Sequence, residues 1–283
     1  MTPPPVAPPV LRCAGRTVAH HASGQGLAPG RSPRPYLHPV RTLAGLAVTE
    51  TAPADHPHHL GAGVAVPDVD GHNFWGGRTF VRGLGPTERD NHGVQAHRAF
   101  ARSEPGGFTE DLDWSAAGRV LLRERRTVTA ARLTDDAWAL DLTFALTNPG
   151  AADVTLGSPA TNGRPGAGYG GFFWRAPKEA RPPAVFTADR EGEDAVHGRP
   201  ADWLALSGDG WTLVFAAATE ETRRDPWFVR AGQYPGVGSS LAAAARLRIA
   251  PGATAVRRVV TVVADGRADR TRAAGLASRA VTG

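Results

Sequence analysis

The chain has 283 residues, 41% of them hydrophobic, with 34 glycines, 24 prolines and a formal net charge of +5. This apolar content excludes a disordered chain, and the abundance of glycine and proline argues against a mainly helical one. All basic residues except Lys178 are arginines, and they are interspersed with acids, as in segments 123–126 and 220–225. Nucleic-acid-binding proteins instead gather basic residues in a stripe of one sign, so we expect no nucleic-acid partner.

The single cysteine, Cys13, excludes a disulfide framework and a cysteine-based zinc site within one chain. Residues 1–21 lack a basic segment followed by an apolar one, and no apolar run approaches the roughly 18 residues that span a bilayer. We therefore expect a cytoplasmic protein with no membrane partner.

Residues 1–9 are rich in proline and are predicted to be a disordered lead-in to a single β-sandwich domain over residues 10–283. Segment 10–22 contains one or two strands, and segments 34–42 and 45–51 are expected to form a hairpin around Ala44 and Gly45. Apolar and charged residues alternate in segment 119–133, and one interpretation places its Glu124 on a solvated face.

The clearest strand is segment 138–148, WALDLTFALTN. Alternation puts large apolar residues on one face, namely Trp138, Leu140, Leu142, Phe144 and Leu146. A turn at 148–150 closes the strand, and segment 153–160 is expected to pair with it.

Segments 201–208 and 211–219 predict a second hairpin with a turn at Asp209 and Gly210, and segments 241–252 and 254–266 predict the last pair. Only residues 267–283 have helical composition. The sequence therefore predicts an all-β fold, a large antiparallel β-sandwich with a short C-terminal helix.

Four of the ten histidines lie in segment 54–77, ADHPHHLGAGVAVPDVDGHNFWGG. If residues 56–59 continue as a strand, His56 and His58 share a face and His59 takes the other. Two imidazoles on one face are the start of a metal site, which would need further ligands such as His38, Asp55, His92 or His97. Neutral histidines doing acid–base work on a sugar and a purely structural turn remain the alternatives.

Two other segments combine turns with polar and aromatic side chains. In residues 68–77, a turn at Asp70 precedes Asn73, Phe74 and Trp75, and rings beside amides are typical of carbohydrate pockets, although a place in the core is equally open. Residues 157–175 are rich in glycine and hold further candidates, namely Asn162, Arg164, Tyr169, Trp174 and Arg175. Weaker candidates are His92, Gln95 and His97 in segment 90–100, and Trp227, Arg230 and Tyr234 in segment 225–236.

The ordered blocks RPYLHPVRT, VTE, DHPHHLG, DVDGHNFWGG, GSPATNGRPGAGYGGFFWR and PWFVR resemble the PmoA-like family of bacterial proteins of unknown function, from about Arg34 to Asp265. The family's name is borrowed from a methane monooxygenase subunit that is embedded in the membrane, so the name does not describe the activity of this chain. Members often accompany sugar oxidoreductases, which are therefore a candidate partner. The resemblance implies a supersandwich fold similar to that of galactose mutarotase, whose relatives act on sugars in a concave sheet face.

The first hypothesis is a carbohydrate-active enzyme of sugar catabolism, of the epimerase, lyase or hydrolase type, acting on a small carbohydrate or oxidised sugar. The acid–base candidates are His56, His58 and His97, and the substrate-binding candidates are His38, Asp55, His59, Asn73, Trp75, Asn162, Arg164, Tyr169, Trp174 and Arg175. A mutarotase also uses a glutamate base, for which Glu50, Glu110 and Glu124 are open.

Two further hypotheses remain. One is a non-catalytic carbohydrate-binding partner of a sugar oxidoreductase. The other is a metal-dependent enzyme in which His56 and His58 bind a divalent metal. Apart from that metal, no cofactor is expected.

Overall fold

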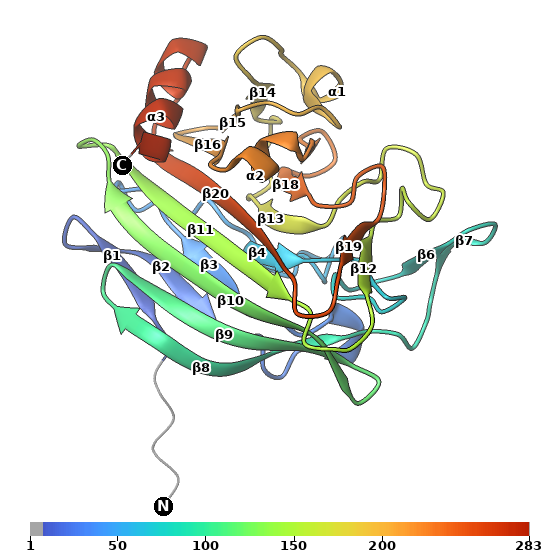
Figure 1. Ribbon diagram of the computed structural model, residues 1–283. Helices are drawn as coiled ribbons and strands as arrows, with labels where there is room; N and C mark the ends of the chain where they lie inside the picture. Colours follow the sequence, from blue (N-terminus) through green and yellow to red (C-terminus); the bar gives the residue numbers. More distant parts are fainter. Residues whose placement is uncertain (1–7, 283) are drawn as a thin grey trace, which may run out of the picture.

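The computed structural model describes residues 8–282 and shows two large antiparallel sheets packed face to face (Figure 1). The sequence-predicted β-sandwich is confirmed. Of the proline-rich lead-in, residues 1–7 lie outside the described part. The first strand begins at Val10, immediately after the predicted segment.

The first sheet has seven strands, in the order β1 (Val10–Cys13), β2 (Arg16–Ala22), β3 (Tyr36–Val40), β4 (Ala62–Ala65), β13 (Gly171–Arg175), β18 (Gly236–Ser240) and β17 (Trp227–Arg230). The second sheet has eight, in the order β14 (Ala184–Phe186), β15 (Trp203–Ser207), β16 (Trp211–Ala217), β20 (Thr254–Asp265), β11 (Ala137–Thr147), β10 (Arg119–Arg132), β9 (Gly107–Ala116) and β8 (Val94–Glu104).

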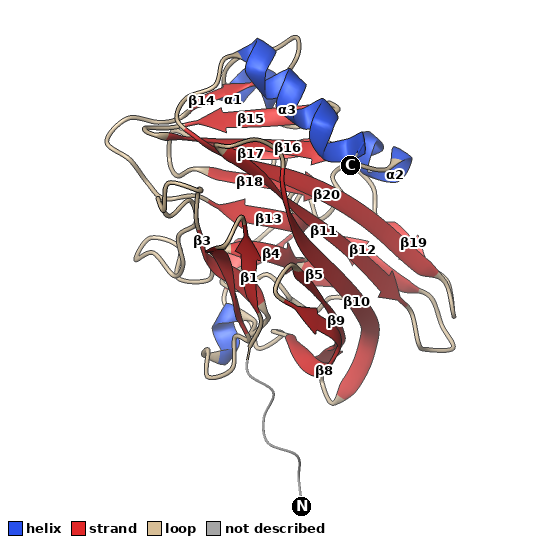
Figure 2. Ribbon diagram, turned by 90° about the vertical axis from the view of Figure 1, so that its left-hand side faces the viewer, coloured by secondary structure: helices blue, strands red, loops and turns tan. Residues whose placement is uncertain are grey.

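Smaller elements complete the fold. A three-stranded sheet contains β19 (Leu247–Ile249), β12 (Val154–Gly157) and β5 (Asp68–Val69), and a hairpin contains β6 (Thr79–Val81) and β7 (Gly85–Thr87). The helices are η1 (Pro29–Arg31), α1 (Glu193–Val196), α2 (Glu220–Arg224) and α3 (Arg270–Thr282). The last of these is the predicted C-terminal helix, and it covers the outer face of the second sheet around β15, β16 and β20 (Figure 2).

Strand alternation decides what each face of the sheets contains. In β11, Leu140, Leu142 and Phe144 are buried in the core between the sheets, as predicted. In β13, Phe172 and Trp174 enter the same core, whereas Phe173 and Arg175 lie on the other side of the first sheet. That outer face therefore has a separate cluster of buried residues, Ala65, Trp75, Phe173, Phe228 and Tyr234.

Two predicted strand pairs are wrong. The strand after the turn at 148–150 does not pair with β11, because β12 leaves that sheet and pairs with β19 and β5. For the same reason β19 does not pair with β20, whose neighbours are β11 and β16. The hairpin around Ala44 and Gly45 and the β15–β16 hairpin are present as predicted.

The core between the sheets also contains an ion pair. Arg126 donates from Nε and Nη2 to the two oxygens of Glu124, at 2.7 and 2.8 Å, and Glu124 also accepts from the Trp114 indole at 2.8 Å. Arg126 further donates to Gln95 and to the carbonyl of Pro35, which immediately precedes β3 of the opposite sheet, both at 3.0 Å. The interpretation that placed Glu124 on a solvated face is wrong, because its side chain is fully buried.

No helix within residues 8–282 combines the length and the apolar character needed to cross a lipid bilayer.

Candidate functional site

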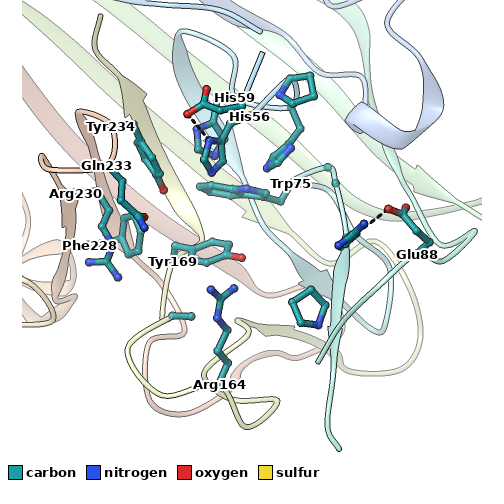
Figure 3. Close-up of a pocket in the computed structure, with 18 residues that line it drawn as sticks. His56, His59, Trp75, Glu88, Arg164, Tyr169, Phe228, Arg230, Gln233 and Tyr234 are labelled. Carbon is teal, nitrogen blue, oxygen red and sulfur yellow. Dashed lines mark hydrogen bonds and ion pairs between the residues drawn. The ribbon is translucent and has the colours of Figure 1, made fainter. Parts of the chain in front are cut away.

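A cavity of about 530 Å³ lies on the outer face of the first sheet, beside β17 (Figure 3). We call it the main pocket because candidate residues from segments 54–77 and 157–175 line it. Its walls come from segments far apart in the chain: the histidine segment, the loop after Asn73, the β6–β7 hairpin, the glycine-rich loop and β17. The lining residues are Asp55, His56, Pro57, His58, His59, Trp75, Gly76, Gly77, Arg78, Pro86, Glu88, Arg164, Ala167, Tyr169, Phe228, Arg230, Gln233 and Tyr234.

The histidines reach the pocket because their segment forms turns. Backbone hydrogen bonds join the His56 N–H to the Pro53 carbonyl at 3.0 Å and the His59 N–H to the His56 carbonyl at 2.9 Å. The strand alternation that would separate His59 from the other two is therefore absent. The rings of His56 and His59 stack with centres 4.6 Å apart, and His58 meets His59 edge-on at 4.8 Å. All three imidazoles thus form one wall.

A carboxylate lies next to the His56 imidazole. His56 Nδ1 is 3.0 Å from Asp55 Oδ2, and about a third of the His56 side chain is exposed. Burial acts to raise the pKa of the Asp55 carboxyl, but the contact with His56 and the charges of His56 and Arg175 outweigh it, so this pKa lies below its usual value. Nδ1 of His56 is buried and faces this carboxylate at ion-pair distance without a hydrogen bond, so Nε2 is the nitrogen available for proton transfer.

The other two histidines are neutral at physiological pH. Burial, followed by the charges of Arg34, His56 and His92, lowers the pKa of His58 to about 4. Burial and the surrounding positive groups lower the pKa of His59 even further. A neutral imidazole both donates and accepts a hydrogen bond, so this wall suits sugar hydroxyl groups.

Arg175 lies behind the wall and fixes His59. The guanidinium is 1% exposed, contacts Glu50 Oε2 through Nη2 at 2.9 Å and lies 4.6 Å from the centre of the Tyr234 ring. Its Nη1 donates to His59 Nδ1 at 3.3 Å. Because arginine can only donate, Nδ1 of His59 is the unprotonated nitrogen and Nε2 holds the hydrogen. Arg175 was expected to bind substrate, but its side chain does not line the cavity.

Asn73 holds the loop that positions Trp75. Its Oδ1 accepts from the backbone N–H groups of Trp75 and Gly76 at 2.8 and 2.9 Å, and Asn73, a substrate-binding candidate, does not line the cavity. Gly77 has φ of +68°, and a Cβ atom there would lie 2.9 Å from the His58 ring. This close approach requires glycine. Trp75 lines the pocket, whereas its neighbour Phe74 belongs to the core.

The glycine-rich loop contributes Arg164 and Tyr169. Tyr169 packs against Trp75, with ring centres 4.6 Å apart, and Arg164 points toward the same rings from below in Figure 3. His197, which the sequence did not single out, ties this loop to β17. Its Nε2 donates to the Gly166 carbonyl at 2.9 Å, while its Nδ1 accepts from the Val229 N–H at 3.2 Å.

The remaining wall contains one ion pair and several residues that the sequence analysis treated as weak candidates or did not identify. Arg230 and Tyr234 were weak candidates, and their segment, PWFVRAGQYPG, has the aromatic and basic residues that could have raised them. Arg78 and Glu88 pair at 2.9 Å across the β6–β7 hairpin. No local signal marks these two, because their place at the pocket depends on the tertiary fold.

His97, expected as an acid–base group, lies in a different cluster. Its Nδ1 is 2.8 Å from Glu110 Oε1, and the other oxygen of this fully buried glutamate is 3.0 Å from His21 Nε2. These residues belong to β8, β9 and β2. The expectation that His97 joins His56 and His58 in one pocket is therefore wrong.

Three other substrate-binding candidates also lie away from the main pocket. Trp174 is buried in the core, where its indole donates to the Val48 carbonyl at 2.8 Å. His38 bonds to Thr49 at 3.0 Å, and Asn162 donates to the Asp68 carboxylate at 2.9 Å. None of the three lines the main pocket.

The glutamates considered as a base have other partners. Glu50 binds Arg175, Glu110 bridges two histidines and Glu124 pairs with Arg126. The carboxylates that line the pocket, within residues 8–282, are Asp55 and Glu88.

His56 and His58 do not gain the further ligands that a metal centre needs. Throughout residues 8–282, no three or more His, Cys, Asp or Glu side chains are grouped so that they could hold a metal ion. The expected metal ligation by His56 and His58 is thus not supported by the arrangement of donor atoms.

Comparison with known proteins assigns the chain to a family but does not assign an activity. No curated protein sequence matches the chain. A family model described as a family of unknown function, DUF6807, matches residues 9–278. This match spans nearly the whole sandwich, including every residue that lines the pocket. The chain therefore belongs to the DUF6807 family of proteins of unknown function.

Proposed function

We propose that this protein is a carbohydrate-active enzyme of sugar catabolism that binds a small carbohydrate in the main pocket and uses His56 for proton transfer. The observation that supports it is the convergence of three imidazoles, a carboxylate and an aromatic wall in one cavity of about 530 Å³. This volume lies within the range of about 300–1,000 Å³ that is usual for small-molecule sites.

The aromatic wall supports the sugar part of the proposal. Trp75, Tyr169, Phe228 and Tyr234 all line the cavity, and their rings contact one another or the histidines. The C–H groups of a pyranose face are weakly positive and pack on the negative face of a ring, whereas its hydroxyl groups need polar partners nearby. Gln233 and the neutral His58 supply such partners.

The Asp55–His56 contact supports the enzyme part. A base must be accessible and within reach of a proton on the substrate, and about a third of the His56 side chain is exposed. Its partner carboxylate stabilises the imidazolium that forms when His56 takes a proton. Arg175 donates to Nδ1 of His59, so the hydrogen of this ring, which is 2% exposed, lies on Nε2.

A relationship to galactose mutarotase and to PmoA-like proteins is part of this proposal. The first sheet presents a polar, aromatic pocket on one face, in keeping with sugar enzymes built on a supersandwich. Glu50, Glu110 and Glu124, the glutamates considered as a base, do not line the pocket, and Glu88, which does, is paired with Arg78. In this proposal Asp55 with His56 therefore takes the role of the base.

The test is proton NMR in D₂O of sugars, uronic acids and keto sugars incubated with the protein. Abstraction of a carbon-bound proton replaces it with deuterium, and elimination or hydrolysis gives new signals. We expect His56→Ala to reduce turnover by about 100-fold or more. His97→Ala, whose imidazole lies outside the pocket, is the matched control and should keep full turnover.

Equal turnover by wild type and His56→Ala would refute the assigned role of His56. Binding of a sugar without any turnover would favour the alternative, a non-catalytic carbohydrate-binding partner of a sugar oxidoreductase.

A further inference from the structure

The pocket has more positive than negative groups. Three arginines line it, and only Arg78 has a carboxylate partner that also lines the pocket, Glu88 at 2.9 Å. Arg230 stacks on Phe228 at 4.8 Å and lies 3.6 Å from Glu193, outside the lining. The third, Arg164, is drawn in Figure 3 without any bond to another lining residue.

The lowered pKa values of His58 and His59 reflect the same positive surroundings. After burial, the main influences that lower the pKa of His58 are positive charges, with Arg34 first among them. Arg175 acts in the same direction on the pKa of His59. Two carboxylates lie at this end, Asp55 at 3.0 Å from His56 and Glu50 at 2.9 Å from Arg175. Arg164 forms no ion pair among residues 8–282, so an added negative charge in this cavity would be stabilised at Arg164.

We propose that the ligand is a sugar acid whose carboxylate is bound by Arg164 while its ring packs against Trp75 and Tyr169. This inference rests on the proposed function and specifies its substrate class. Arg164 is set on the glycine-rich loop, and its planar fork of N–H donors matches the two oxygens of a carboxylate.

A carboxylate fits better than a phosphate group. A sugar phosphate carries close to two negative charges and three acceptor oxygens, and proteins usually meet it with several donors or a helix N-terminus. Here a single lining arginine, Arg164, forms no ion pair within residues 8–282. The opposite end of the cavity is occupied by Asp55 and the histidines, which suit the uncharged part of the molecule.

The test compares sugars that differ only in oxidation at C6: D-glucuronate with D-glucose, and D-galacturonate with D-galactose. Affinities are measured by isothermal titration calorimetry with wild type, Arg164→Gln and Arg119→Gln. Arg119 is an exposed residue at the start of β10 and does not line the pocket. Arg119→Gln changes the net charge by the same amount and is the matched control.

We expect wild type to bind at least one uronate about 10-fold more tightly than its neutral counterpart. Arg164→Gln should remove this preference, and Arg119→Gln should keep it. Equal binding of uronate and neutral sugar by wild type would overturn the inference and leave the proposed sugar pocket standing.

Two further ligands separate the parts of the proposal. Inorganic phosphate or cyclohexanecarboxylate binding as tightly as the best uronate, with the same loss in Arg164→Gln, would overturn both the sugar acid and the proposed function. Preferential uronate binding that survives Arg164→Gln would overturn the assignment to Arg164. Uronate binding that depends on Arg164 but gives no turnover would support the inference and contradict only the proposed catalytic activity.

Discussion

Arg126→Met tests whether the ion pair inside the sandwich behaves as a buried charge network. The substitution keeps an unbranched apolar side chain but removes four hydrogen bonds, including the two to Glu124. The Glu124 carboxylate then keeps only the Trp114 indole as a partner. Leaving one buried charge of a pair uncompensated costs about 3–5 kcal/mol, a large part of a typical stability of about 5–15 kcal/mol.

Urea unfolding followed by circular dichroism measures this loss. With an m value of about 3 kcal/mol/M, the transition midpoint should fall by about 1 M or more. Glu124→Gln combined with Arg126→Met removes the uncompensated charge and keeps an acceptor for Trp114, so the double variant should recover more than half of the loss.

The control lies one residue away on the opposite face of β10. Arg125 forms the same two-bond pair with Asp111, at 2.9 and 3.1 Å, but in solvent. Arg125→Met should leave the midpoint unchanged within error. Equal effects of Arg125→Met and Arg126→Met would refute the argument that burial decides the strength of this pair.

Three further predictions concern titration and positioning. Because the pKa of His58 falls from 6.5 to about 4 on folding, the unfolded chain binds more protons between these values, and His58 should remove on the order of 3 kcal/mol of stability as pH drops from 6.5 to 4. Unfolding curves against pH check this, and a wild-type slope retained in His58→Asn would contradict it. Glu110→Gln should destabilise the fold by about 1–3 kcal/mol in thermal unfolding yet leave sugar binding intact, since it contacts His21 and not the pocket. Arg175→Met should raise the pKa of His59 in a ¹⁵N NMR titration and weaken sugar binding; an unchanged pKa would show that Arg175 does not act on that ring.

The strands that could be predicted are those whose pattern is local. In β11 buried and half-buried residues alternate from Leu140 to Thr147, and the β15–β16 hairpin is marked by a turn between two apolar runs. The pairings of β12 and β19 were predicted wrongly because these strands have no such local pattern. These strands have three or four residues, and their partners are chosen by packing rather than by neighbouring sequence.

The site shows the same division. The density of histidine and glycine in segments 54–77 and 157–170 marked both loops, and the structure brings His58 and Arg164 to one cavity. Trp174 and Arg175 were misassigned because a run of five buried residues in β13 does not reveal which face each side chain takes. His97 was misassigned because its partner Glu110 lies across a strand pair, which no spacing along the chain discloses.

Histidine-selective ¹H–¹⁵N NMR during titration with D-glucuronate and D-galacturonate tests the central claim, that the histidine wall and the glycine-rich loop form one sugar site. The account predicts that the ring signals of His56, His58 and His59, assigned with single variants, shift on binding. Those of His21 and His97 should stay in place, because both imidazoles lie in the separate Glu110 cluster. Ligand-dependent shifts at His21 and His97, with the three pocket signals unchanged, would contradict the account.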